Sequence, residues 1–128
     1  MNTLQRILCV EDEADIQAVA RMALELVGHF QVGVCSSGEE ALREVRAFAP
    51  DLVLLDVMMP GMDGPTTLNA LRELPGLQDL PVVFMTAKVQ PSEVALYRSL
   101  GALDVIAKPF DPMTLSDQVR GIWEKHRG

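Results

Sequence analysis

Five short apolar runs alternate along the chain with longer stretches in which apolar residues recur every three or four positions. A continuous apolar run is typical of a strand covered on both faces, whereas the longer recurrence indicates an amphipathic helix. The predicted strands are Arg6–Val10, Gln31–Cys35, Leu52–Asp56, Val82–Thr86 and Val105–Ala107. This alternation predicts an α/β fold, in which five strand–helix units, (βα)5, form a doubly wound parallel sheet.

The stretches between the predicted strands contain the usual markers of helix ends. Ser37, with Glu40 three residues later, fits a capping box at a helix start. Asp111 followed by Pro112 fits a cap with proline at the first helical position. The last helix is expected to end near Lys125, so we expect residues 1–128 to form a single domain with no second domain behind it.

The composition limits the partners that the chain is expected to bind. Hydrophobic residues make up 48% of the 128 positions and aromatic residues 5%, which predicts an aliphatic core. The formal net charge of −7 argues against unaided binding to nucleic acid or to an anionic membrane. We therefore expect no direct nucleic-acid partner and no membrane partner.

The cysteines and the apolar runs bear on where the protein resides. Cys9 and Cys35 lie in apolar runs and are too few for a disulfide framework, so we expect buried thiols in a reducing compartment. No charged start followed by an apolar stretch marks a signal peptide. The longest apolar stretch, Leu52–Met59, is interrupted by Asp56 and is too short to cross a bilayer. These features predict a cytoplasmic protein.

Charged residues follow the apolar runs where the predicted strands end. Glu11 and Asp12 follow the first strand, Asp56 ends the third, and Lys108 follows the fifth. The carboxyl ends of parallel strands share one edge of a sheet, and flavodoxin-like folds bind ligands there. Carboxylates ~4 Å apart repel by about 1 kcal/mol in water and about 4 kcal/mol at a surface-like dielectric. Three of them together indicate a bound cation, shifted pKa values or both, and the added lysine predicts a site for a phosphoryl group.

The segment LLDVMMPGMDG, residues 54–64, separates a functional aspartate from a structural one. Turn chemistry explains its proline and its glycines, and Asp63 fits a turn or a helix start. It does not explain why Asp56 ends an otherwise apolar strand, so we interpret Asp56 as functional. Thr86 ends the fourth strand at the same edge, where its hydroxyl can bond a phosphoryl oxygen.

In these motifs the chain resembles the receiver domain of two-component response regulators. The resemblance extends from Arg6 to about Trp123 and rests on four segments in the same order and spacing. They are VEDE (10–13), LLDVMMPGMDG (54–64), MTAK (85–88) and AKPF (107–110). The resemblance implies a flavodoxin-like fold with strand order 2-1-3-4-5. It also implies a stand-alone receiver domain over residues 1–128, without an output domain.

Carried over by residue, the resemblance implies a phosphoacceptor and a metal site. Asp56 matches the phosphoacceptor, and Asp12 matches a direct ligand of Mg²⁺ (or Mn²⁺). Asp56 itself and the backbone carbonyl of Met58 match the other protein ligands, and Glu11 matches an acidic neighbour that acts through a metal-bound water.

The resemblance also implies the groups that respond to the phosphoryl group. Thr86 matches the switch hydroxyl, the backbone N–H of Ala87 a phosphoryl contact, and Lys108 the lysine that pairs with the acceptor. A cis peptide is implied before Pro109. The chain departs from the family at Val105, where many receivers carry an aromatic residue that rotates on activation.

The expected function follows from this resemblance. A sensor histidine kinase or a histidine phosphotransfer protein would supply the phosphoryl group. The phosphorylated domain would then signal to a target protein through the face of the fourth helix, fifth strand and fifth helix. We expect a monomer or a weak phosphorylation-dependent dimer. We expect no enzyme activity beyond self-phosphorylation from a phosphodonor and slow autodephosphorylation.

Three other functions remain open from the sequence. The domain can be a phosphorelay intermediate or phosphate sink without an output of its own. An FMN-binding flavodoxin-like carrier shares the fold class, but the acidic residues 11–13 would repel its phosphate. A phosphatase of the haloacid dehalogenase type needs a second aspartate two residues after the first, where this chain has Met58.

Overall fold

A single parallel sheet forms the centre of the molecule in the computed structural model, which describes residues 3–127. Its strand order is β2-β1-β3-β4-β5, as the resemblance implied. The strands are β1 (Arg6–Val10), β2 (Gln31–Cys35), β3 (Leu52–Asp56), β4 (Val82–Thr86) and β5 (Asp104–Ala107). The predicted bounds of the first four are confirmed, and the fifth begins one residue earlier than predicted.

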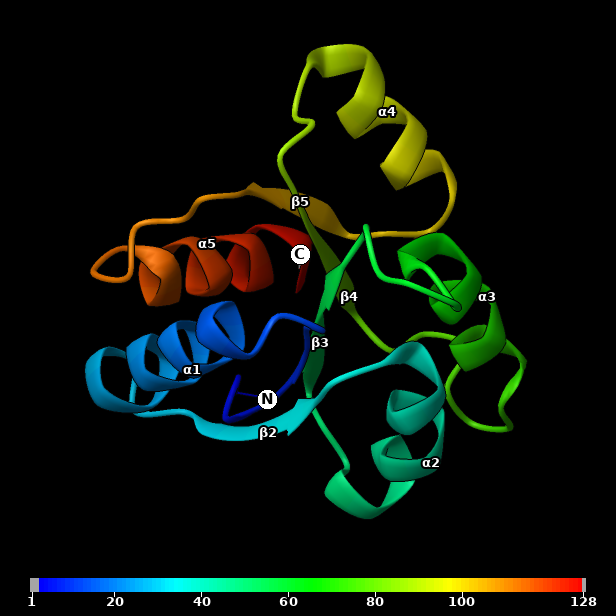
Figure 1. The fold of residues 1–128 in the computed structure, drawn as a ribbon, viewed down its shortest axis with the longest axis horizontal. Helices are drawn as coiled ribbons and strands as arrows, with labels where there is room; N and C mark the ends of the chain where they lie inside the picture. Colours follow the sequence, from blue (N-terminus) through cyan, green and yellow to red (C-terminus); the bar gives the residue numbers. More distant parts are fainter. Residues whose placement is uncertain (1–2, 128) are drawn as a thin grey trace.

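Helices cover both faces of the sheet, which confirms the doubly wound arrangement (Figure 1). Helices α1 and α5 lie side by side on one face, and α2 and α3 lie on the other with α4 beyond them. The helices are α1 (Ala14–Met22), the π-helical turn η1 (Ala23–Val27), α2 (Gly38–Phe48), α3 (Gly64–Glu73), α4 (Pro91–Ser99) and α5 (Leu115–Arg127).

The sheet divides the core into two layers of mainly aliphatic side chains. Alternate residues of each strand point to opposite faces, so neighbours along β4 enter different layers. Phe84 packs with the side chains under α2, α3 and α4, whereas Met85 packs with those under α1 and α5. Strands β3 and β4 are buried along their whole length, as their continuous apolar sequence predicts.

Caps define the helix starts on both sides of the functional edge. The Ser37 hydroxyl accepts a hydrogen bond from the Glu40 backbone N–H at 3.1 Å, although the Glu40 carboxylate accepts from the Ser36 N–H rather than closing the predicted box. Asp63 caps α3 by accepting from the Thr66 N–H at 2.9 Å, which confirms it as a helix-start residue. Asp111 caps a turn that leads into α5, three residues later than a proline-first helix would begin.

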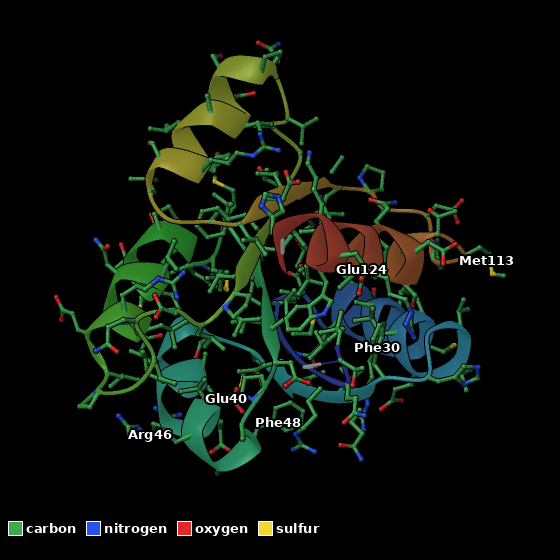
Figure 2. All side chains as sticks on the ribbon, turned by 180° about the vertical axis from the view of Figure 1, so that it is seen from behind. Phe30, Glu40, Arg46, Phe48, Met113 and Glu124 are labelled. Carbon is green, nitrogen blue, oxygen red and sulfur yellow. The ribbon has the colours of Figure 1, made fainter. Side chains whose placement is uncertain are left out.

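The first helix does not remain a regular α-helix to its end. Its last turn, η1, is π-helical, and the Ala23 carbonyl there accepts a hydrogen bond from the buried Ser116 hydroxyl of α5 at 3.2 Å. A β-carbon at Gly28 would lie 2.3 Å from the Ser116 oxygen, so only glycine allows this approach. Arg120 donates to the Gly28 carbonyl and stacks over Phe30, which Figure 2 shows close to α1. The α1–α5 pair is therefore joined by both packing and hydrogen bonds.

A glycine also fixes the loop between β3 and α3. A β-carbon at Gly64 would lie 2.8 Å from both the Asp56 carbonyl oxygen and the Val57 α-carbon. The Gly64 N–H donates to the Val57 carbonyl at 2.9 Å. This close backbone contact folds the loop back on the end of β3 and holds Asp56 at the edge of the sheet.

Candidate phosphoryl site

Hydrogen bonds of the strand ladder continue past the strand ends and bring the candidate residues to one edge. The Glu11 N–H donates to the Cys35 carbonyl at 3.0 Å, which holds the β1 loop next to β2. The Lys108 N–H donates to the Thr86 carbonyl at 2.9 Å, which holds the β5 loop next to β4. Asp56 ends β3, between β1 and β4. The structure confirms that these residues, distant in sequence, lie at the same edge of the sheet.

Lys108 joins two buried carboxylates. Its Nζ lies 2.9 Å from Oε1 of Glu11 and 3.2 Å from Oδ1 of Asp56. Glu11 is 0% and Asp56 2% exposed, while the lysine side chain is 16% exposed. The sequence predicts that the lysine pairs with Asp56 or with an incoming phosphate, but its shorter contact is to Glu11. Lys108 is thus held between both acids before any ligand arrives.

Burial sets the acid–base properties of this cluster. Loss of hydration raises the pKa of Glu11 above its ordinary value, although hydrogen bonds from the Glu13 backbone and from Lys108 lower it in part. Burial likewise raises the pKa of Asp56, with Lys108 acting in the opposite direction. Burial alone would lower the pKa of Lys108, but its hydrogen bonds to Glu11 and Asp56 outweigh this and raise it.

The acidic cluster has the composition of a divalent-cation site. One carboxylate oxygen each from Glu11, Asp12 and Asp56 lies within 4.8 Å of the others. Among residues 3–127, the buried Oδ1 of Asp12 has no hydrogen-bond partner. Both Glu11 oxygens already accept protein donors, Lys108 at 2.9 Å and the Glu13 N–H at 3.1 Å. Oxygen-only donor sets suit hard cations such as Mg²⁺, Ca²⁺ and Mn²⁺, so these residues can hold such a metal.

The remaining predicted residues lie on the adjoining loops. Thr86 is buried, and its hydroxyl accepts a hydrogen bond from the Lys88 N–H at 3.1 Å. Ala87 follows it and is exposed. Met58 has a side chain 69% exposed, and its backbone N–H lowers the pKa of Asp56 by hydrogen bonding. The peptide bond between Lys108 and Pro109 is cis, as the resemblance implied.

One side chain that holds the site was missed in the sequence. Gln17 in α1 donates from Nε2 to the carbonyls of Glu11 at 3.1 Å and Cys35 at 3.2 Å, so it ties the β1 loop to α1. Its polar character fits an ordinary exposed helix position, and no local pattern distinguishes it. Its role becomes visible only in the folded chain, where α1 lies next to the loop after β1 and the end of β2.

Comparison with known proteins agrees with this geometry. The family model for the response regulator receiver domain matches residues 7–120, and the chain belongs to that family. The DNA-binding response regulator MtrA of Mycobacterium tuberculosis is 42% identical over 121 residues, which are 94% of this chain and 51% of the relative. A probable transcriptional regulator, ycf27 of Guillardia theta, is 34% identical over 95% of this chain and 46% of the relative.

Solved structures show the same likeness. The chemotaxis protein CheY4 of Vibrio cholerae superposes with a TM-score of 0.85 at 26% identity, over 94% of this chain and 99% of that one. The N-terminal domain of a response regulator receiver protein from Methanoculleus marisnigri gives a TM-score of 0.73 at 37% identity, over 97% of each chain. The flavodoxin-like fold is therefore that of known receiver domains.

The relatives correct the prediction about partners. The chain spans about half the length of the curated relatives it matches, and MtrA is a DNA-binding response regulator. The prediction of no nucleic-acid partner is wrong. The net charge of −7 describes this chain, which matches about half of each relative, so it does not test what the other half of the relative binds.

The described part of the chain contains no helix that is both long and apolar enough to cross a membrane. Both cysteines are buried free thiols, which confirms their interpretation as core residues.

Proposed function

We propose that this receiver domain accepts a phosphoryl group on Asp56 from a phosphohistidine donor. The observation that carries the proposal is the buried contact of Lys108 with Asp56 and Glu11, beside an unpartnered oxygen of Asp12. A lysine held by two acids at a sheet edge can transfer its contact to an arriving phosphoryl oxygen without a large movement. Membership of the receiver family supports the same chemistry.

The step itself is a transfer between two nucleophiles. An Asp56 carboxylate oxygen attacks the phosphorus in line, the P–N bond to the donor imidazole breaks, and the imidazole leaves with its electron pair and takes up a proton. Lys108 offsets the charge of the equatorial oxygens, so the contribution of the protein is positioning and electrostatic stabilisation. The product is an acyl phosphate, which water hydrolyses slowly; we propose no other enzyme activity.

The metal that fits the site is Mg²⁺. Asp12, Asp56 and the Met58 backbone carbonyl would hold it, with Glu11 acting through a water because its oxygens are already engaged. When bound, the ion supplies positive charge that neutralises the carboxylates and the phosphoryl oxygens.

The response to the phosphoryl group begins at Thr86. Its hydroxyl hydrogen is available to a phosphoryl oxygen, because the hydroxyl oxygen acts as acceptor in the contact with the Lys88 N–H. Turning toward the phosphoryl group would carry the backbone of residues 87–90 with it. A two-state element of this kind is what converts local charge into a signal.

The output has two candidates. The names of the mycobacterial relatives favour control of DNA binding as the context in which this receiver acts. The relay or phosphate-sink role needs no conformational output, so a test of conformational coupling separates the two.

Intact-mass spectrometry with a small nitrogen–phosphorus donor tests the proposal. Phosphoramidate with Mg²⁺ is expected to add one phosphoryl group, and omission of the metal is expected to prevent the addition. Absence of an adduct with phosphoramidate and with acetyl phosphate, both in the presence of Mg²⁺, would refute the phosphoacceptor function.

A further inference from the structure

Helix α4 has one buried residue among those described, Tyr97, and Glu93 and Val94 are half-buried. The neighbouring Leu96 and Leu100 are exposed. Helices α2 and α3 each bury several residues. Figure 1 shows α4 beyond β5, at the edge of the sheet. The position of α4 therefore depends strongly on what Tyr97 contacts.

Tyr97 contacts Phe84, which lies two residues before Thr86. The two ring centroids are 5.4 Å apart and the ring planes meet at 85°, an edge-to-face arrangement. Residues two apart on a strand share a face, so Phe84 and Thr86 both point toward the layer that contains Tyr97. Phe84 is fully buried and has little freedom to absorb a change at Thr86.

Strand β5 has no aromatic residue beside this pair. The strand register places Val105 opposite Phe84, and Val105 packs half-buried against the same core layer. A β-branched side chain has restricted rotamer freedom, so Val105 cannot swing between an inward and an outward position. The aromatic residue that connects the end of β4 to a surface helix comes from α4 instead.

The backbone offers a second connection between the same elements. The Thr86 hydroxyl accepts from the Lys88 N–H, and the loop that follows ends at Pro91, where α4 begins. A movement of Thr86 would thus reach α4 at its start through the loop and in its last turn through Phe84 and Tyr97.

We propose that Tyr97 is the positioning residue that couples the phosphoryl site to α4, with Phe84 as its contact on the sheet. This proposal rests on the proposed function, since it requires a phosphoryl group on Asp56. Movement of Thr86 repacks the Phe84 ring against Tyr97, and α4 moves because Tyr97 is its buried anchor. The exposed side chains of Leu96 and Leu100 move with the helix, which changes the surface that a downstream element meets.

The composition of the chain makes this coupling measurable. Tyr97 is the one tyrosine and Trp123 the one tryptophan, so 3-fluorotyrosine and 5-fluorotryptophan each give a single fluorine resonance. Trp123 lies in the core layer on the other face of the sheet and serves as the matched control. Beryllofluoride with Mg²⁺ mimics the phosphoryl group, and its own bound fluorine resonances report whether the site is occupied.

We expect beryllofluoride to shift the Tyr97 resonance and to leave the Trp123 resonance nearly unchanged. A bound beryllofluoride signal with an unshifted Tyr97 resonance would overturn the coupling and leave the phosphoacceptor function intact. Equal shifts of both reporters would also overturn it, because the change would then be global. Absence of any bound beryllofluoride signal would refute the proposed function and the coupling with it.

Three variants separate coupling from a merely structural role. Tyr97→Leu is expected to abolish the beryllofluoride-dependent amide shifts of α4, whereas Tyr97→Phe, which keeps the ring, and Leu96→Ala, an exposed neighbour, are expected to retain them. Melting curves identify any variant that does not fold, and the wild-type fluorine measurement decides the question in that case. Wild-type α4 shifts in folded Tyr97→Leu would overturn the proposal.

Discussion

Replacing Lys108 with alanine is expected to destabilise the metal-free domain strongly at neutral pH. The substitution leaves the buried carboxylates of Glu11 and Asp56 without their shared cation. Attraction at 2.9 and 3.2 Å amounts to about 5 kcal/mol per contact at an effective dielectric of about 20. The cost of burying the ammonium offsets much of this, so removal of one partner of a buried pair typically costs about 3–5 kcal/mol.

The loss of stability in Lys108→Ala should depend on pH in a defined direction. Burial holds the pKa of Glu11 and of Asp56 above ordinary carboxyl values, so the folded state binds their protons more tightly than the unfolded chain does. The stabilisation that comes from these raised pKa values is complete at a pH below the ordinary carboxyl pKa. It is lost as the pH rises through the pKa values of the two groups in the folded state. Without Lys108 these pKa values rise further. The deficit of the variant is therefore expected to be largest near neutral pH and to shrink toward about pH 5.

Urea unfolding of wild type and Lys108→Ala, followed across this pH range without metal, measures the effect. For a domain of this size about 3–5 kcal/mol corresponds to a fall in melting temperature of roughly 10–20 °C. Lys88→Ala removes an exposed lysine near the same edge and is expected to change stability by less than about 0.5 kcal/mol. A deficit that matches Lys88→Ala, or that does not vary with pH, would refute the assignment of Lys108 as the partner of both acids.

The metal site, the core thiols and the loop after Asp56 each allow a further test. Mg²⁺ at a hundredfold excess over its dissociation constant is expected to add about 2.7 kcal/mol of stability, and Asp12→Asn to reduce this gain; identical melts with metal and with chelator would contradict the metal site. The thiols of Cys9 and Cys35, whose pKa values burial raises to about 12, are expected to resist thiol reagents until the protein unfolds. Because the unfolded thiols ionise near pH 9.0, stability should fall as the pH rises between about 9 and about 12. Met58→Asn is expected to speed loss of the phosphoryl group, because an exposed apolar side chain there cannot orient an attacking water; unchanged decay in a phosphate-release assay would refute this.

Much of the fold and of the candidate site could be predicted because both depend on local pattern. Continuous apolar runs marked β3 and β4, and the rule that parallel strands end at one edge was enough to bring Asp56 and Lys108 together. Asp63 was separable from Asp56 because cap residues and strand-end residues occupy different local patterns. These features need only neighbours along the chain and the order of the strands.

The features that could not be predicted depend on contacts between distant segments. In the π-helical turn η1, the Ala23 carbonyl accepts a hydrogen bond from Ser116, which lies 93 residues later in the chain. The sequence around neither residue indicates this contact. The shorter contact of Lys108 with Glu11 depends on side-chain geometry between β5 and β1, which are not neighbours in the sheet. The same limit applies to Gln17, whose partners lie in the loop after β1 and at the end of β2. The prediction about nucleic acid failed for a different reason, since charge describes only the segment in which it is counted.

Identification of the phosphorylated residue tests the central claim most directly. After treatment with acetyl phosphate and Mg²⁺, borohydride reduces an aspartyl phosphate to homoserine, which peptide mass spectrometry locates in the chain. We predict homoserine at position 56 in the wild type and no phosphoryl adduct on Asp56→Asn. Homoserine at position 12, or labelling of Asp56→Asn equal to that of the wild type, would contradict the assignment of Asp56 as the phosphoacceptor.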